Sequence, residues 1–361
     1  MNVLGIETSC DETSAAVVRD GRDVRSNVVS SQIELHRAHG GVVPELAARA
    51  QLTAIIPVVE EALEQAGVGL DEIEAIAVTR GPGLAGSLLV GANFAKTVAY
   101  ARSIPLVGVN HLEAHLYANW LTPPDADPGE QPDFPILALL VSGGHTELLL
   151  MTAHGRYEQL GRTLDDAAGE AFDKGARLLG LGYPGGPAIQ KVAANGNSAA
   201  FALPRAWLGE SHDFSFSGLK TALLREVEPY RLPNEDDAPE DDAPFRKHRT
   251  PLFAEGMPVA DLSASFQEAI VDVLAVKTAA ATRTYETKQV VLAGGVAANR
   301  ALRERLDAEI ASISGTLLRV PSLSYCTDNA AMVAAAGFYA MRRGMQSGWE
   351  LDVASRLPIG G

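Results

Sequence analysis

Two histidines four residues apart are the side chains in this sequence best spaced for chemistry. They stand in the segment Asn110-His111-Leu112-Glu113-Ala114-His115. On a helix, residues four apart project from one face, as a pair of metal-binding imidazoles does. Asn110 and Glu113 are expected to form a capping box at the helix start, whose positive partial charge keeps a nearby imidazole neutral. The spacing predicts a metal site, and the alternative is that both histidines pack or face solvent.

The position of Glu113 distinguishes this pattern from that of a zinc peptidase. The pattern HExxH places a glutamate directly after the first histidine, and HxxEH places one directly before the second. Glu113 stands in neither place. A metallopeptidase is therefore the less favoured interpretation of the histidine pair.

A third metal ligand is expected from a distant part of the chain. Asp328 is the candidate, because it stands where the last helix is expected to begin. Its alternative role is that of a helix N-cap, and Cys326 is the alternative ligand. Two histidines and a carboxylate leave positions open for substrate oxygens and suit iron or zinc.

Three glycine pairs predict a nucleotide site. They are Gly143-Gly144, Gly185-Gly186 and Gly294-Gly295. Glycine lets backbone N–H groups approach an anion closely, so several such turns facing one cleft would hold phosphates and a sugar. Each pair alone is equally typical of an ordinary turn. A dinucleotide-binding fingerprint at 81–86 lacks the expected acid after the next strand, and the chain contains neither GxSxG nor a P-loop.

Three acidic residues near these turns are further candidates. Asp11 and Glu12 lie in the first expected hairpin turn, where they could act as a base or hold a cation. Asp173 follows Ala171-Phe172 on an expected helix and could accept a hydrogen bond from a ribose or threonine-like hydroxyl. The alternative for all three is a solvated carboxylate.

Strand-like runs alternate with helix-like patterns, which is typical of an α/β protein. An expected hairpin at residues 3–8 and 14–19 has a counterpart at 135–142 and 146–152. Further strands are expected at 75–80, 106–109 and 289–293. Helices are expected at 44–66, 84–101, from 110 onward, and at 165–180, 184–195, 261–285, 299–308 and 328–343. The halves begin alike on either side of a linker at 122–134, which predicts a duplicated architecture with a cleft between them.

The composition limits the class of protein. With 361 residues, 47% of them hydrophobic, the chain can form two domains with sizeable cores. Asp and Glu outnumber Lys and Arg by 45 to 30, and the net charge of −15 disfavours a general attraction to nucleic acid or anionic membranes. Two cysteines without CxxC spacing, no signal-peptide pattern and no long apolar stretch predict a cytoplasmic protein without a membrane span.

An acidic insertion is expected at about 229–258. Residues 234–242 contain six acids, and the basic tetrad 246–249 follows closely. This composition is typical of a mobile surface segment. Pairing of the tetrad with the acids is favoured over a nucleic-acid contact.

Seven motifs together resemble the TsaD family of tRNA N6-adenosine threonylcarbamoyltransferases, once described as glycoprotein endopeptidases. The resemblance covers nearly the whole chain in family order. The motifs are Leu4-Gly-Ile-Glu-Thr-Ser-Cys-Asp-Glu-Thr13, His111-Leu-Glu-Ala-His115, Leu140-Val-Ser-Gly-Gly-His-Thr146, Glu170-Ala-Phe-Asp-Lys174, Phe214-Ser-Phe-Ser-Gly-Leu-Lys220, Ala293-Gly-Gly-Val-Ala-Ala-Asn299 and Thr327-Asp-Asn-Ala-Ala-Met332.

The resemblance implies an actin-like, sugar-kinase-like (ASKHA) fold of two RNase H-like domains with a nucleotide cleft between them. The expected domains are 1–121 with about 329–361, and 134–328. One divalent metal ion per subunit, Fe(II) or alternatively zinc, would bind His111, His115 and Asp328. The residues implied to contact threonylcarbamoyl-AMP are Leu140, Val141, Ser142, Gly143, Gly144, Asp173, Gly186, Gln190 and Asn299; many family members have an acid in place of Gln190.

The implied reaction is acyl transfer to tRNA. N6 of adenosine 37, in tRNAs reading ANN codons, attacks the carbamoyl carbon, and AMP leaves. Asp11 or Glu12 is the hypothetical base. The acidic chain would need a local basic patch or partner proteins to bind tRNA, and the resemblance implies a TsaB-like paralogue and a TsaE-like ATPase. The alternatives are an ATPase or kinase of the same fold and, less favoured, a metallopeptidase.

Overall fold

The chain folds around two five-stranded mixed sheets with matching topology. The computed structural model describes residues 1–124, 126, 129–233 and 251–360. The first sheet has the order β3-β2-β1-β4-β5 and the second the order β8-β7-β6-β9-β10. In each sheet three antiparallel strands come first along the chain, and two parallel strands are then added beside the first strand. The prediction of a duplicated, hairpin-first α/β plan is confirmed.

The strands are short, and the central ones are buried. The first sheet comprises β1 (Asn2–Glu7), β2 (Glu12–Arg19), β3 (Asp23–Ser31), β4 (Ala75–Gly81) and β5 (Leu106–Asn110). The second comprises β6 (Ile136–Val141), β7 (Thr146–Ala153), β8 (Arg156–Arg162), β9 (Gln289–Ala293) and β10 (Leu317–Arg319). Every residue of β6 is buried, as expected for a strand covered on both faces.

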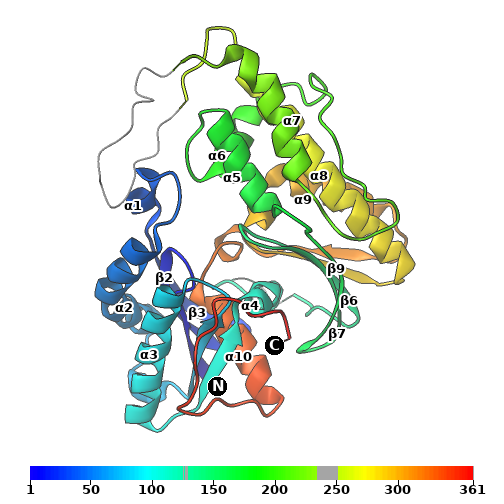
Figure 1. Cartoon of the computed structure of the whole chain (residues 1–361). Helices are drawn as coiled ribbons and strands as arrows, with labels where there is room; N and C mark the ends of the chain where they lie inside the picture. The colour runs from blue at the N-terminus through cyan, green and yellow to red at the C-terminus, as the bar shows by residue number, and fades with distance from the viewer. Residues whose placement is uncertain (125, 127–128, 234–250, 361) are drawn as a thin grey trace.

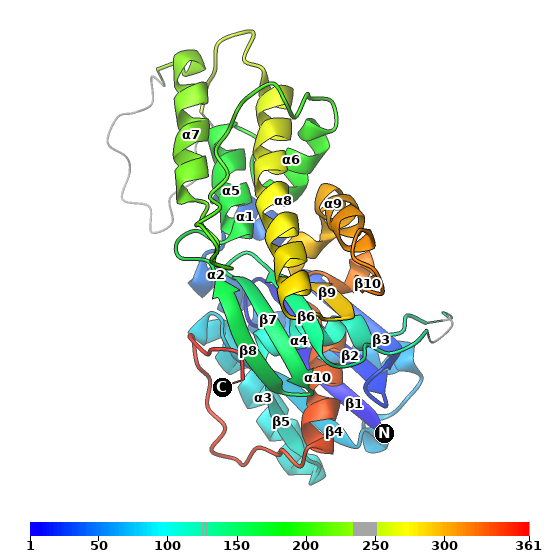
Figure 2. The same cartoon turned by 90° about the vertical axis from the view of Figure 1, so that its right-hand side faces the viewer.

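Helices cover both faces of each sheet (Figures 1 and 2). Helices α2 (Pro44–Ala66) and α3 (Ala85–Arg102) pack on the outer face of the first sheet. Helices α5 (Ala168–Leu178), α6 (Gly185–Ala193), α7 (Ser217–Val227), α8 (Val259–Thr284) and α9 (Arg300–Ala311) pack against the second sheet. Between the sheets lie α4 (His111–Tyr117) and α10 (Ala330–Arg342). Strand β6 shows the layering: Ile136, Ala138 and Leu140 face this middle core, and the residues between them face the outer core.

The remaining elements are short. They are helix α1 (Ile33–Arg37) and the 3-10 turns η1 (Leu70–Glu72), η2 (Ala118–Trp120), η3 (Glu228–Tyr230), η4 (Gly295–Ala298) and η5 (Leu323–Tyr325). No helix in the described ranges is long and apolar enough to cross a membrane.

Most of the expected elements are present, and a few further elements were missed. The helix expected at 44–66 ends at Gly67 with φ 65°, the left-handed conformation that favours glycine. Strands β3, β8 and β10 and helix α7 were not predicted, because β3 and β8 are half-exposed and polar and β10 has three residues. The acidic run 234–242 and the basic tetrad 246–249 lie outside the described residues. At the edges of that expected insertion, η3 and an isolated bridge between Arg231 and Phe253 are present.

Candidate active site

The histidine pair and Asp328 form one cluster. His111 and His115 project from α4 toward the segment that leads into α10. Oδ1 of Asp328 lies 3.2 Å from Nε2 of His115 and 3.6 Å from Nε2 of His111. One ligand atom from each residue lies within 4.8 Å of the other two. The sheet topology therefore brings together side chains more than 200 positions apart.

The cluster fits a metal ion. His115 is 1% exposed, yet neither of its ring nitrogens makes a well-aligned hydrogen bond to another described residue. Buried imidazoles normally have such partners. Three donor atoms that converge from two imidazoles and a carboxylate match the ligand types that iron and zinc accept. Cys326 lies outside this cluster, and its Sγ accepts a hydrogen bond from Arg303 at 3.0 Å.

Asp328 is not the helix cap. Asn329 is the N-cap of α10, where its Oδ1 accepts a hydrogen bond from the backbone N–H of Met332. The carboxylate of Asp328 therefore remains directed at the histidines.

A buried carboxylate that sequence reasoning missed orients His111. Glu7, at the end of β1 and fully buried, places Oε2 3.1 Å from Nδ1 of His111. The same carboxylate accepts hydrogen bonds from the Ser9 backbone N–H at 2.5 Å and the Thr79 hydroxyl at 2.6 Å. A carboxylate on one imidazole nitrogen leaves the other nitrogen available to a metal. The signal in the sequence was an acid ending an otherwise apolar strand.

The expectation of a neutral imidazole is wrong for His111. Burial alone would lower its pKa, but the carboxylates of Asp328 and Glu7 outweigh burial and raise the pKa to about 9. For Asp328, burial would raise the pKa, but the two histidines lower it to about 2. The partial charge at the start of a seven-residue helix is weaker than two full charges at contact distance. A metal ion would therefore displace a proton from His111.

Only one of the two hydrogen bonds of the expected capping box is present. Asn110 caps α4 through Oδ1, which accepts from the backbone N–H groups of Leu112 and Glu113. The Glu113 carboxylate instead accepts from the Tyr157 hydroxyl and from the Gly360 backbone N–H, both at 3.2 Å. Glu113 thus joins α4 to β8 and the C-terminal segment. It does not belong to the metal cluster.

The acidic turn, which joins β1 to β2 and contains Asp11 and Glu12, lies near both the cluster and the second half of the chain. Asp11 is 6% exposed. Burial, followed by the charges of Asp328 and Asp11, raises the pKa of Glu12 well above its usual value. Gln51, another residue that sequence reasoning missed, holds this turn: its Nε2 donates to the carbonyl oxygens of Cys10 at 2.9 Å and Glu12 at 3.1 Å.

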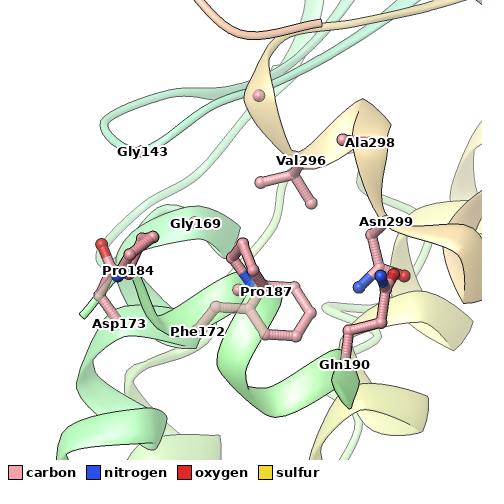
Figure 3. A pocket seen from close by; sticks show the side chains of 12 residues that line it. Gly143, Gly169, Phe172, Asp173, Pro184, Pro187, Gln190, Val296, Ala298 and Asn299 are labelled. Carbon is pink, nitrogen blue, oxygen red and sulfur yellow. The ribbon is translucent and has the colours of Figure 1, made fainter. Parts of the chain in front are cut away.

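A cavity of about 230 Å³ lies in the second half (Figure 3). All three predicted glycine pairs contribute to it, through Gly143, Gly186 and Gly295. Figure 3 shows the amides of Gln190 and Asn299 at one end and Asp173 at the other. The remaining lining residues are Gly169, Phe172, Pro184, Pro187, Val296 and Ala298. A mainly apolar cavity with glycine turns and a few polar groups is typical of a nucleotide pocket.

Several polar groups of this cavity also hold its walls together. Oδ1 of Asp173 accepts from the Gly185 backbone N–H at 2.7 Å, so it joins α5 to α6. Oε1 of Gln190 accepts from the Arg300 backbone N–H at 2.6 Å. Asn299 is the N-cap of α9, where its Oδ1 accepts from the Leu302 backbone N–H.

The predicted segment 140–144 is divided by the fold. Gly143 lines this cavity, and Gly144 lines a neighbouring one. The side chains of Leu140 and Val141 lie in the middle and outer cores. The Ser142 hydroxyl accepts from the His145 backbone N–H at 3.2 Å and closes the turn.

The cavity and the acidic turn face each other across the two halves. Burial, and next the carboxylates of Asp11 and Asp173, raise the pKa of the Tyr183 hydroxyl. Asp173 has its pKa raised by burial and, in smaller part, by Asp11. Because the charges of both carboxylates act on Tyr183, the acidic turn and the nucleotide-type pocket are neighbours.

The two matching α/β halves define the fold class of the chain, the actin-like, sugar-kinase-like (ASKHA) fold. Two solved structures share the fold at 14% sequence identity. HypF from T. kodakarensis matches with a TM-score of 0.60 over 95% of this chain and 48% of that chain. Component A of (R)-2-hydroxyglutaryl-CoA dehydratase from Acidaminococcus fermentans matches with a TM-score of 0.51 over 95% and 98%.

Sequence comparison identifies the family within this class. Residues 23–335 match the family described as TsaD: tRNA N6-adenosine threonylcarbamoyltransferase. Proteins of that name from Thermomicrobium roseum and Bacillus subtilis are 60% and 52% identical over 360 and 353 residues. These alignments cover 99% and 98% of this chain and 97% and 94% of the relatives. The chain belongs to the TsaD family and is a transferase that acts on tRNA.

Proposed function

We propose that the enzyme transfers the threonylcarbamoyl group from threonylcarbamoyl-AMP to N6 of adenosine 37 in tRNAs that read ANN codons. The observation that carries the proposal is the cavity formed by the three glycine turns beside the acidic turn and the metal cluster. Such a cavity suits the adenylate part of the donor: Phe172 and Pro187 offer apolar surface to a base, and the glycine turns offer backbone N–H groups to a phosphate.

A divalent metal ion, Fe(II) with zinc as the alternative, would be held by His111, His115 and Asp328. Bound there, it would supply Lewis-acid stabilisation to oxygens of the donor. Glu7, through its contact with Nδ1, would hold the His111 ring so that Nε2 is directed at the metal.

The chain's own groups would manage the proton. The N6 amine attacks the carbamoyl carbon, the bond from that carbon to the phosphate oxygen breaks, and AMP leaves with the bonding electrons. The proton lost from N6 passes to Asp11 or Glu12. Of the two, Glu12 needs a nearby cation to act as a base, because burial and neighbouring carboxylates raise its pKa. Single-turnover rates of Asp11→Asn and Glu12→Gln test this role, and two unchanged rates would reject it.

The proposed reaction can be tested directly. Purified enzyme is mixed with threonylcarbamoyl-AMP and unmodified tRNA reading an ANN codon, with and without partner proteins. The digested nucleosides are then analysed by mass spectrometry. We expect threonylcarbamoyladenosine that disappears in His111→Ala and persists in Arg225→Gln, a control on the exposed surface of α7. No product under any condition would refute the proposal, and sustained ATP turnover without tRNA would favour the ATPase or kinase alternative.

Partner proteins are part of the proposal. A net charge of −15 opposes tRNA binding, and α2 and α3 expose large apolar side chains that a protein partner can cover: Leu52 is 64% exposed, Ile56 55% and Leu89 44%. We propose a TsaB-like paralogue and a TsaE-like ATPase, with the cytoplasm as the compartment.

The domain boundaries 1–121 with 329–361 and 134–328 also remain a proposal. The return of α10 to the first sheet, where it contacts β1, β2 and β4, supports it.

A further inference from the structure

A second cavity adjoins the nucleotide-type pocket at the same glycine turn. Gly143 lines the first cavity, and its neighbours Gly144 and His145 line the second, which has a volume of about 560 Å³. Strands β7 and β8 form one wall, and the C-terminal segment 355–358 forms another. Two substrates bound in these cavities would therefore meet at the turn.

This second cavity lies beside helix α4, which carries the two histidines of the cluster. Leu112, which lines it, directly follows the ligand His111 on α4. His145 lines it as well, next to the glycine turn that the two cavities share. An acyl transfer needs the acceptor beside the bound donor, and a cavity that adjoins the donor pocket at the Gly143-Gly144 turn offers the acceptor such a place.

The walls carry groups that suit RNA. Arg162 and Arg356 both line the cavity and are exposed, and within the described part of the chain neither forms an ion pair with a carboxylate. Arginine binds phosphate through its planar fork of N–H donors. Glu147, on β7, lines the same cavity; its buried Oε2 makes no well-aligned hydrogen bond to a described residue, and Gln159 and Arg162 of β8 are its electrostatic partners. A buried acceptor of this kind is normally satisfied, and the amino groups of unpaired bases are donors.

We propose that this cavity binds the single-stranded loop of the RNA substrate, with Arg162 and Arg356 on its phosphates and Glu147 accepting a hydrogen bond from a base. The inference rests on the proposed function, because that reaction needs an RNA acceptor beside the donor pocket. The competing explanation is local: Arg162 and Glu147 are opposite each other in the β7–β8 register and would serve only the sheet.

The test compares Arg162→Gln, Arg356→Gln and the double variant with Arg225→Gln in the full chain with its partners. Affinity for unmodified tRNA is measured by fluorescence anisotropy over a series of salt concentrations. Loss of a charged phosphate contact is expected to weaken binding about tenfold for each arginine. Each loss should also reduce the slope of log affinity against log salt by about 0.7. Affinity for threonylcarbamoyl-AMP alone should stay unchanged, which also shows that the variants are folded.

Wild-type-like tRNA affinity and salt slope in the double variant would overturn the inference. Glu147→Gln distinguishes the local explanation: loss of tRNA affinity with an unchanged melting temperature supports a base contact, and a lower melting temperature with unchanged tRNA affinity contradicts it. Because tRNA binding is measured without turnover, absence of modified nucleoside in the wild type would refute the proposed function and leave this test decisive on its own.

Discussion

Metal binding to the triad should become stronger as the pH rises from 7 to 9. The carboxylates of Asp328 and Glu7 raise the pKa of His111 to about 9, so at pH 7 the metal-free enzyme carries a proton on this ligand. The pKa of Asp328 is about 2, so its carboxylate is already ionised throughout this range. Metal binding to His111 must therefore release one proton from that residue.

The size of this effect on metal affinity follows from the difference between the pH and the pKa of His111. At pH 7, about two units below it, proton competition weakens apparent affinity about 100-fold relative to the intrinsic value, and at pH 8 about tenfold. The apparent Kd should fall about tenfold per pH unit and level off near pH 9. The linked stability has the opposite sign: a raised histidine pKa stabilises the metal-free fold below the ordinary value of 6.5, and this contribution is lost as the pH rises through 9.

The assay is competition for Zn²⁺ with a chromophoric chelator at several pH values, combined with titration calorimetry in two buffers of different ionisation enthalpy. The buffer dependence at pH 7 should give about one released proton per metal ion. His111→Ala provides the control, since its remaining affinity should lose this pH dependence. A wild-type Kd that is constant from pH 7 to 9, with no proton released, would refute the assignment of a charged His111 beside Asp328.

Three further predictions concern residues around the site. Glu7→Gln presents an amide N–H₂ to Nδ1 of His111 and so favours the tautomer with a proton on Nε2; Zn²⁺ affinity at about pH 9 should fall 10- to 100-fold, and an unchanged affinity in the chelator assay would contradict the role of Glu7. Gly294→Ala, at φ +90° and against the Val141 carbonyl oxygen, should lower the free energy of unfolding by about 1–3 kcal/mol, as measured in urea, and more than Gly315→Ala, whose surroundings are open. Gln51→Ala removes the donor that holds the Cys10 and Glu12 carbonyl oxygens, so hydrogen exchange in the acidic turn should accelerate and single-turnover transfer should slow; unchanged exchange would show that the turn is held by other contacts.

The sequence was informative where one short segment carries the whole signal. The four-residue spacing of His111 and His115 places both on one face of α4 whatever surrounds the helix. Gly67 ends α2 as expected, because glycine readily adopts the left-handed conformation there. The apolar run at 135–142 predicted a strand, and every residue of β6 within it is buried.

The sequence was ambiguous where a side chain could have either of two partners. Glu113 has the spacing of a capping box, but Tyr157 and Gly360 lie within reach of its carboxylate. Asp328 and Asn329 are both acceptable N-caps, and the fold uses the second because the first faces the histidines. Local sequence contains both options, and the choice depends on neighbours that are distant in the chain.

The sequence by itself determined the alternation of strands and helices, the duplicated plan, the histidine pair and the glycine turns, because each depends on residues close together along the chain. Only the tertiary structure decided that Glu7 supports His111, that Asp328 completes the cluster, and that the segment 140–144 divides between two cavities. It also reversed the expected charge of His111. The physical reason is that hydrogen bonding, desolvation and Coulomb energy depend on distance in space, and the packing of α4 and α10 between two sheets sets those distances.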